Sequence, residues 1–343
     1  MAAVITIDGS IGEGGGQILR TALSLSAITK TNIALGKIRA GREKPGLRRQ
    51  HLTCVRAVAE ICGATVSGDE IGSQELVFAP GKIKAGNYRF DVGTAGSVTL
   101  VAQTTIPVLL MADGVSTVAI TGGTHVPFAP IWEFFESCYL PELRRMGAKI
   151  EAKLGSYGFS PAAGGVVELR VWPFDSNRKL ESYELTDLGV YRGGSVIGVV
   201  SAIPKSIAEA EVGIVLRQFP KLDLTPEVRT IDSFGPGNYC YAKLDYERAS
   251  VVFSSVGAFD KSRKTVGNEV VQGVRKFLKS GKACEKHLAD QLLVPLVALT
   301  GRHCEEMFRV VWYDDWTLGI QKKTKHYETN KNVIQMFNID DTI

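Results

Sequence analysis

The 343-residue sequence has no apolar run of about 18 residues or more, so it predicts no membrane-spanning helix. No basic segment followed by a short apolar stretch lies near Met1, so no secretory signal peptide is expected. None of the six cysteines forms a C-x-x-C pair, and their spacing suggests no zinc site. These absences predict a cytoplasmic protein whose cysteines are reduced and serve packing. The cysteines are Cys54, Cys62, Cys138, Cys240, Cys284 and Cys304.

Several common catalytic motifs are missing as well. There is no Gly-Lys-Ser/Thr P-loop, no G-x-S-x-G elbow of a serine hydrolase and no H-E-x-x-H metal pair. The G-x-G-x-x-G dinucleotide fingerprint is imperfect and lacks an acidic residue about twenty positions later. The formal net charge of +4 permits a nucleic-acid partner without requiring one. The composition, with 45% hydrophobic and 22% charged residues, is that of an ordinary soluble enzyme.

What the sequence does contain is internal repetition. Residues 14–41 and 93–123 follow one plan, in which small glycines open a helix, a polar joint follows, and an apolar strand ends in glycine. Each is followed by a second helix that should stop at a glycine, because glycine readily adopts the left-handed conformation at a helix end. A looser third copy begins near "CEKHLADQLLVPLVALTG".

Residues 183–276 do not fit this plan. They combine helix-like segments with the period-2 alternation of "NYCYAKLDYERASVVFSSVGAF", which indicates antiparallel strands. The pattern therefore predicts an α/β protein with a large domain of three repeated helix-plus-sheet units, residues 1–182 and 277–343, and a smaller α+β domain inserted at 183–276.

The first chemical candidate is the glycine-paved turn in "GEGGGQILR", with Glu13 and Arg20 beside it. Glycines before a helix expose backbone N–H groups where the helix dipole is positive, which favours phosphate. A tight strand-to-helix turn without chemistry explains the same residues equally well.

Basic residues gather directly afterwards, in "KIRAGREKPGLRRQH". Arginine can grip a phosphate through two parallel N–H bonds, so the cluster favours an anion-binding surface. A solvated loop is the competing interpretation. The second repeat has no such charges at its equivalent place, "GGTHVPFAPIW", so the scaffold itself does not demand them. The cluster comprises Arg39, Arg42, Lys44, Arg48 and Arg49.

Two of the five histidines could carry chemistry. His287 opens "HLADQ", where Asp290 and Gln291 offer hydrogen-bonding groups to a base or ribose, although the segment could simply cap a helix. His326 lies in the basic turn "KTKHYETN". A neutral imidazole attacks phosphorus well and nearby cations would stabilise the developing charge, but such a histidine is more often only solvated.

Taken together, "GEGGGQILR", R-A-x-R-x-x-P-G-L, "DVGTAGSVTLVAQT", "ITGGT" and "HLADQ" resemble the RNA 3′-terminal phosphate cyclase family over essentially the whole chain. The resemblance implies repeated helix-plus-four-stranded-sheet units of the enolpyruvyl-transferase type. It also implies ATP-dependent conversion of an RNA 3′-phosphate end into a 2′,3′-cyclic phosphate, through histidine-bound AMP and then AMP joined to the RNA phosphate. The co-substrate would be ATP and the cofactor a divalent cation, Mg or Mn.

The resemblance also implies roles for individual residues. His326, followed by Thr329 and Asn330, matches the nucleophile, and Glu13 would hold the metal. Arg20, Arg39, Arg42 and Gln50 would face the RNA phosphate or the triphosphate, with no division of roles among them. The ATP pocket would comprise Gln103, Pro130, His287, Leu288, Ala289, Asp290 and Gln291.

Two other functions are compatible with part of these features. A non-catalytic relative that binds RNA during ribosomal RNA processing would lack the nucleophile and the glycine-rich motif, both of which this sequence has. An enolpyruvyl transferase would share only the repeats, and "HLADQ" and His-x-x-Thr-Asn argue against it. The insert could contact substrate or form a homodimer, and the sequence does not decide between the two.

Overall fold

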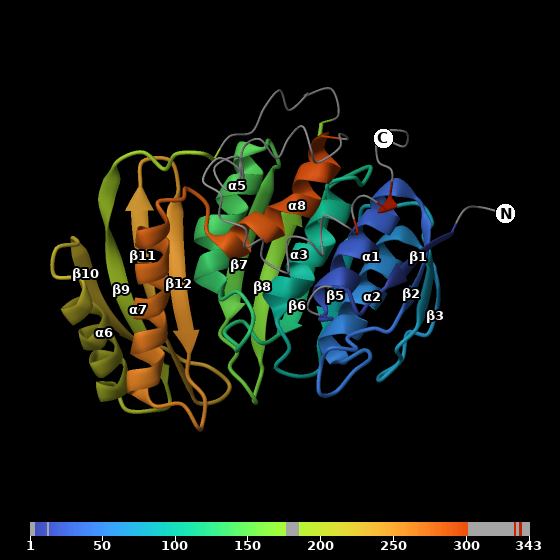
Figure 1. The fold of residues 1–343 in the computed structure, drawn as a ribbon. Helices are drawn as coiled ribbons and strands as arrows, with labels where there is room; N and C mark the ends of the chain where they lie inside the picture. The colour runs from blue at the N-terminus through green and yellow to red at the C-terminus, as the bar shows by residue number, and fades with distance from the viewer. Residues whose placement is uncertain (1–3, 12–13, 176–184, 301–332, 334–335, 338–343) are drawn as a thin grey trace.

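The computed structural model describes residues 4–11, 14–175, 185–300, 333 and 336–337. Within them lie three four-stranded sheets, and the helices cover the same side of all three (Figure 1). The mixed α/β class predicted from the repeats is thus confirmed. No helix among these residues is long and apolar enough to cross a membrane.

The first repeated unit has the strand order β1-β2-β4-β3, with β1 parallel to β2 and the other neighbours antiparallel. Helix α1 connects the two parallel strands, and α2 connects β2 to the antiparallel pair. The elements are β1 (Val4–Asp8), α1 (Gln17–Thr29), β2 (Asn32–Gly36), α2 (Arg49–Cys62), β3 (Thr65–Ser67) and β4 (Leu76–Ala79).

The second unit repeats this topology with the order β5-β6-β8-β7, and β5 again runs parallel to β6. Its second helix is broken into three pieces, because a π-helical stretch interrupts it. The elements are β5 (Asn87–Asp91), α3 (Val98–Leu109), β6 (Ser116–Gly122), α4 (Trp132–Phe134), the π-helix (Phe135–Tyr139), α5 (Leu140–Arg145), β7 (Ile150–Ser156) and β8 (Gly165–Val171).

The predicted glycine stops are present in both units. Gly63 follows α2 at φ 60°, and Gly147 follows α5 at φ 96°. In each unit the chain then turns into a strand, as the repeated pattern predicted.

The third sheet falls within the residues predicted as an insert, and its order, β10-β9-β11-β12, differs from the other two. Helix α7 continues to Ser280, so the boundary predicted after residue 276 lies inside this helix. The division into domains otherwise stays a prediction. The elements are β9 (Tyr191–Ser201), α6 (Ser206–Gln218), β10 (Leu224–Thr230), β11 (Gly237–Tyr246), β12 (Ser250–Val256) and α7 (Arg263–Ser280).

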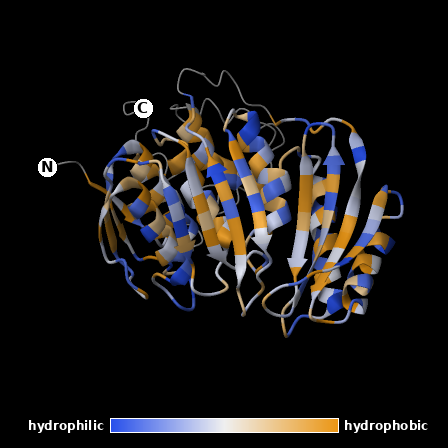
Figure 2. Cartoon of the chain, turned by 180° about the vertical axis from the view of Figure 1, so that it is seen from behind, coloured by the Kyte–Doolittle hydropathy of each residue, from blue (hydrophilic) through white to orange (hydrophobic). Residues whose placement is uncertain are grey.

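The predicted third copy begins with α8 (Lys286–Thr300), and its continuation lies outside the described residues. Helix α8 packs on α1 and α3, so apolar faces of three helices meet in the core. The sheets are apolar toward the helices and alternate with polar residues on the other face (Figure 2), as β8 shows by alternating buried and more exposed positions. This helical layer positions the site.

Candidate active site

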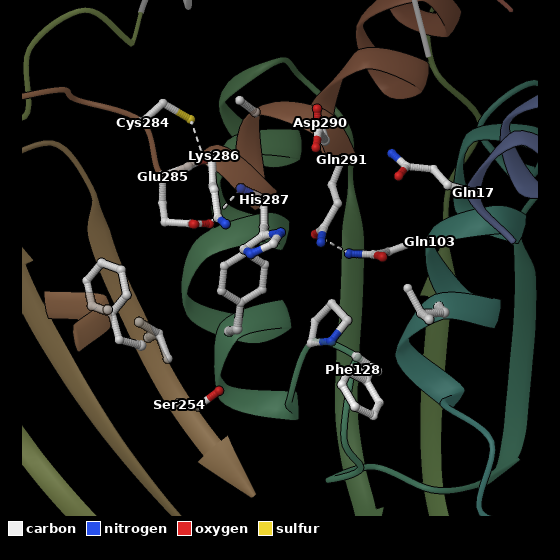
Figure 3. A pocket seen from close by; sticks show the side chains of 18 of the residues that line it. Gln17, Gln103, Phe128, Ser254, Cys284, Glu285, Lys286, His287, Asp290 and Gln291 are labelled. Carbon is white, nitrogen blue, oxygen red and sulfur yellow. Dashed lines mark hydrogen bonds between the residues drawn. The ribbon is translucent and has the colours of Figure 1, made fainter. Parts of the chain in front are cut away.

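A pocket of about 1520 Å³ opens where the two repeated units, α8 and the inserted unit meet (Figure 3). Its walls come from α1, α2, α3, α4, α7, α8, β12 and the loops that join them. Residues that are far apart in the sequence and were predicted to serve one reaction therefore share one cavity. Those lining it are Arg20, Arg39, Arg42, Gln50, Gln103, Pro130, His287, Ala289, Asp290 and Gln291.

The glycine turn before α1 packs tightly against two neighbours. A Cβ atom on Gly14, which has φ 56°, would lie 2.8 Å from the backbone nitrogen of Gly41. A Cβ on Gly16 would lie 2.2 Å from Nε2 of His51. The bare backbone thus lets the basic loop and a histidine ring close onto the start of α1, where Gln17 and Arg20 face the pocket.

Arg39 shapes the basic loop as well as charging it. Its backbone is left-handed at φ 55°, and its Nη1 donates hydrogen bonds of 2.8 Å to the carbonyls of Lys44 and Gly46. Burial, together with the neighbouring charges of Arg42 and Arg48, lowers the pKa of Arg39. Cations held this close repel one another, and a bound anion would relieve that repulsion.

His51 is a pocket residue that the sequence analysis missed. Burial and the adjacent arginines, Arg20 first among them, lower the pKa of His51 to about 3, so the ring is neutral at physiological pH. Its Nδ1 accepts a 3.4 Å hydrogen bond from the backbone N–H of Arg48. The proton must then sit on Nε2, which makes the ring an uncharged donor beside the arginines. The sequence signal that could have identified His51 is its position in the first turn of a helix that follows the basic loop.

Gln50 joins the first unit to the second. Its Oε1 accepts a 2.8 Å hydrogen bond from the backbone N–H of Ser97, the residue before α3. With the oxygen engaged, the amide nitrogen is the group that Gln50 can offer to a phosphate.

At the other end of the pocket, Gln103 of α3 donates a hydrogen bond from Nε2 to Oε1 of Gln291 on α8 (Figure 3). Both residues were predicted to line one nucleotide pocket, and they are in direct contact. Glu285 lies directly before α8, and its Oε2 accepts hydrogen bonds from the backbone N–H groups of His287 at 2.8 Å and Leu288 at 3.3 Å. Such an N-cap fixes the direction in which the helix enters the pocket.

The residues of "HLADQ" divide between the pocket and the core. His287, Ala289, Asp290 and Gln291 line the pocket, and Asp290 is almost fully buried. Leu288 does not line it, and its side chain packs in the hydrophobic core instead. Helical geometry explains the difference, since one residue in the segment must turn to the opposite face.

The inserted unit contributes one wall of the pocket. Phe253 and Ser254 of β12 and Glu269, Gln272 and Lys276 of α7 all line it. Two further lysines line it, Lys282 on the connection from α7 to α8 and Lys286 at the start of α8. The sequence left the role of the insert open between substrate contact and a homodimer, and this placement favours substrate contact.

A buried polar network supports the loop that carries Pro130. Nε2 of His125 lies 2.9 Å from Oε2 of Glu133, and the hydroxyl of Tyr239, from the inserted unit, donates to Oε1 at 2.6 Å. Burial opposes ionisation of Glu133, but His125 and Tyr239 outweigh it and lower the pKa of the carboxyl. The ionised carboxylate only accepts, so His125 donates from Nε2.

Glu13 and His326, the predicted metal ligand and nucleophile, lie outside the described residues. Among the residues that are described, no group of three or more histidine, cysteine, aspartate or glutamate side chains could hold a metal ion. The described residues of the pocket therefore offer cationic and neutral donors for phosphate at one end and flat or apolar walls at the other. This combination suits a nucleotide together with a second phosphorylated ligand.

A family model described as RNA 3′-terminal phosphate cyclase matches residues 11–340. The RNA 3′-terminal phosphate cyclase of Pseudomonas fluorescens is 43% identical over 336 residues, which cover 97% of this chain and 92% of that protein. The protein of that name from Ralstonia nicotianae is 44% identical over 304 residues, 88% of this chain and 86% of its own. The one from Koribacter versatilis is 40% identical over 338 residues, 97% and 90% of the two chains.

Proposed function

The chain belongs to the RNA 3′-terminal phosphate cyclase family, and we propose that it converts RNA 3′-phosphate ends into 2′,3′-cyclic phosphodiesters at the expense of ATP. One observation supports this most: ten residues assigned from sequence to ATP or to the RNA phosphate line a single pocket. At about 1520 Å³, this pocket exceeds the roughly 300–1,000 Å³ usual for one small ligand. It has room for ATP and an RNA end together.

The proposed reaction has three transfers at phosphorus. A ring nitrogen of His326 bonds to the α-phosphorus of ATP, and the bond to pyrophosphate breaks. An oxygen of the RNA 3′-phosphate then takes the adenylyl group from the histidine. Finally the neighbouring 2′-hydroxyl attacks the RNA phosphorus, loses its proton and expels AMP, which closes the ring. Adenylation supplies the leaving group that a phosphate monoester lacks.

The last transfer depends on proximity. The 2′-oxygen is already placed to close a five-membered ring, so little freedom is lost in the transition state. Because DNA lacks this hydroxyl, the chemistry itself selects RNA. The described residues need only hold the phosphate and stabilise the charge that develops on it.

Roles can be proposed for the two ends of the pocket. Arg20, Arg42 and the neutral Nε2–H of His51 would bind phosphate oxygens, and Arg39 would hold the basic loop in shape while adding charge. His287 and Pro130 would flank the adenine, with the Gln103–Gln291 pair beside it. A divalent cation, held by Glu13, would neutralise phosphate charge, as hard cations prefer carboxylate and phosphate oxygens.

A labelling experiment tests this function. The protein is incubated with ATP labelled at the α-phosphate, and the adduct is located by mass spectrometry. We expect an acid-labile AMP adduct on His326, its loss in His326→Ala, and a cyclic end on a 3′-phosphorylated oligoribonucleotide. His287→Tyr should keep the adduct, because a flat ring is all that position requires. An adduct on His287, or no consumption of ATP, would contradict the proposal.

We also propose that the protein acts in the cytoplasm. All five cysteines in the described part of the chain, Cys54, Cys62, Cys138, Cys240 and Cys284, are free thiols. Free and mostly buried thiols suit the reducing cytoplasm, in which we place the protein. A homodimer stays a prediction from the sequence.

A further inference from the structure

Phe128 is an aromatic side chain placed where folding gains nothing from it. It lines the pocket, yet its ring is fully exposed, at 105% of the reference area. Its backbone has φ 62°, a conformation that is a genuine outlier for a bulky residue. Among described non-glycine residues with positive φ, Phe128 is the one aromatic. Strain of this kind is commonly kept at sites that bind ligands.

The loop that presents the ring is anchored at both ends. Val126 and Ile131, at its two ends, are 6% and 0% exposed, so the loop is pinned to the core on both sides. Pro127 and Pro130 restrict the backbone between them, and the carbonyl of Pro130 accepts a 2.7 Å hydrogen bond from Oγ1 of Thr99. The ring is therefore held out at little further entropic cost to binding.

The network beneath the loop makes this support polar as well as apolar. His125, directly before the loop, is fully buried and contacts Glu133, which in turn receives the hydroxyl of Tyr239. The ring of His125 also stacks on Tyr239, with centroids 4.2 Å apart. The second repeated unit and the inserted unit thus both support the loop, and the tip of the loop faces the pocket.

We propose that Phe128 is a stacking platform for a nucleobase at the 3′ end of the RNA substrate, an inference that rests on the proposed function. In Figure 3, Phe128 lies below His287 and the Gln103–Gln291 pair, beside which the adenine is proposed to bind. An RNA end whose phosphate is bound by the pocket arginines has bases that must lie somewhere along the same pocket. Aromatic rings bind unpaired bases by stacking, which tolerates any sequence.

Steady-state kinetics separate an RNA base from the adenine of ATP. Phe128→Ala should raise the KM for a 3′-phosphorylated oligoribonucleotide roughly tenfold, the size usual for one lost base stack, and leave the KM for ATP unchanged. Phe128→Trp should restore the wild-type value, whereas Phe128→Leu, apolar but not flat, should not. An unchanged KM for RNA, full activity in Phe128→Leu, or a rise confined to ATP would overturn the proposal.

Abasic substrates identify the base that stacks. Oligoribonucleotides that lack one base, at the last, second-last or third-last nucleotide, are each compared with the intact oligonucleotide. For the wild type, one of these positions should raise the KM by about as much as Phe128→Ala does. For the Phe128→Ala variant, the same abasic substrate should not raise the KM any further, because the ring that would stack on the base is already absent. If the increase in KM caused by the missing base and the increase caused by Phe128→Ala simply multiply, the ring and the base do not touch.

Stability measurements test whether Phe128 has a structural role instead. Phe128→Gly removes the ring and also the backbone strain, so its melting temperature should equal or exceed that of the wild type while its KM for RNA rises. Phe259→Ala is the matched control, since Phe259 is equally exposed at 100% but lies outside the pocket lining. It should change neither quantity. A lower melting temperature in Phe128→Gly would assign the ring to folding.

The failure of this inference can be told from failure of the proposed function. If the wild type forms cyclic ends and Phe128→Ala does so with the same KM for RNA, only the stacking role is lost. If the wild type neither binds nor cyclises 3′-phosphorylated RNA, the function fails and the stacking role with it.

Discussion

The hydroxyl of Tyr239 donates a 2.6 Å hydrogen bond to Glu133, a buried carboxylate 106 positions earlier in the chain. Tyr239 belongs to β11 of the inserted unit and Glu133 to α4 of the second repeat. A bond to a buried charge is among the stronger hydrogen bonds in proteins. The contact therefore ties the insert to the repeat that carries the pocket loop.

Tyr239→Phe should destabilise the protein by about 1.5–3 kcal/mol, because it leaves a buried carboxylate short of one donor. Tyr139→Phe is a matched control of opposite sign. Tyr139 is fully buried and its hydroxyl finds no hydrogen-bond partner in the described part of the chain, so losing the hydroxyl should leave stability unchanged or raise it. Urea denaturation measures both. Equal losses of unfolding free energy in the two variants would show that packing, and not the hydrogen bond, decides the effect.

Much of the fold could be predicted because its signals are local. The glycine stops at Gly63 and Gly147 mark helix ends in any context, and the period-2 pattern of the insert marks its strands. The π-helical stretch at Phe135–Tyr139 was not predicted, and it packs against β12 and α8, which are distant in the sequence. The different strand order of the third sheet likewise depends on contacts between distant segments.

For the same reason, some residues of the pocket could be predicted from the sequence and others could not. Gln103 and Gln291 were found because long motifs contain them. His51 was missed because its meaning comes from Gly16 and Arg20, which only the fold brings beside it. The wall from α7 was missed because the insert carries no recognisable motif. Leu288 was included because a motif does not tell which face of a helix a residue takes.

The contact between Gln103 and Gln291 predicts coupled effects on ATP binding. Gln103→Ala and Gln291→Ala should each raise the KM for ATP severalfold. The double variant should be about as impaired as either single one, because each removes the same contact and the shared orientation of α3 and α8. The KM for RNA should change much less. Additive free-energy losses would show that the two amides bind ATP independently.

Glu211 should make the protein less stable as the pH rises. The residue is fully buried in α6, its Oε1 accepts a 2.6 Å bond from Asn238, and its Oε2 has no partner among the described residues. Burial raises the pKa of Glu211 to about 8, against 4.5 for an ordinary glutamate. Between these values the unfolded chain gives up the proton and the folded chain keeps it, so folding stability falls by at most about 1.4 kcal/mol per pH unit.

Glu211→Gln should remove this slope and be more stable than the wild type near pH 8. Chemical denaturation at several pH values between 5 and 8 measures the difference. Glu209→Gln, exposed on the same helix, is the control and should follow the wild type. Parallel curves for wild type and Glu211→Gln would mean that Glu211 is ionised in the folded protein.

His51 predicts the opposite pH dependence, and its test also reaches the site. The folded protein holds the ring neutral, with its pKa lowered by burial and by Arg20 to about 3, while the unfolded chain protonates it near 6.5. Stability should therefore fall as the pH drops below about 6.5, again by at most about 1.4 kcal/mol per unit. His51→Gln keeps an N–H donor without the titration, so it should lose less stability than the wild type between pH 6.5 and 4.5. In the folded wild type, the NMR shift of the ring should stay that of neutral imidazole down to about pH 4 and move when inorganic phosphate binds beside it. A ring that titrates near pH 6.5 in the folded protein would show that the arginines do not surround it, and the phosphate end of the pocket would have to be placed elsewhere.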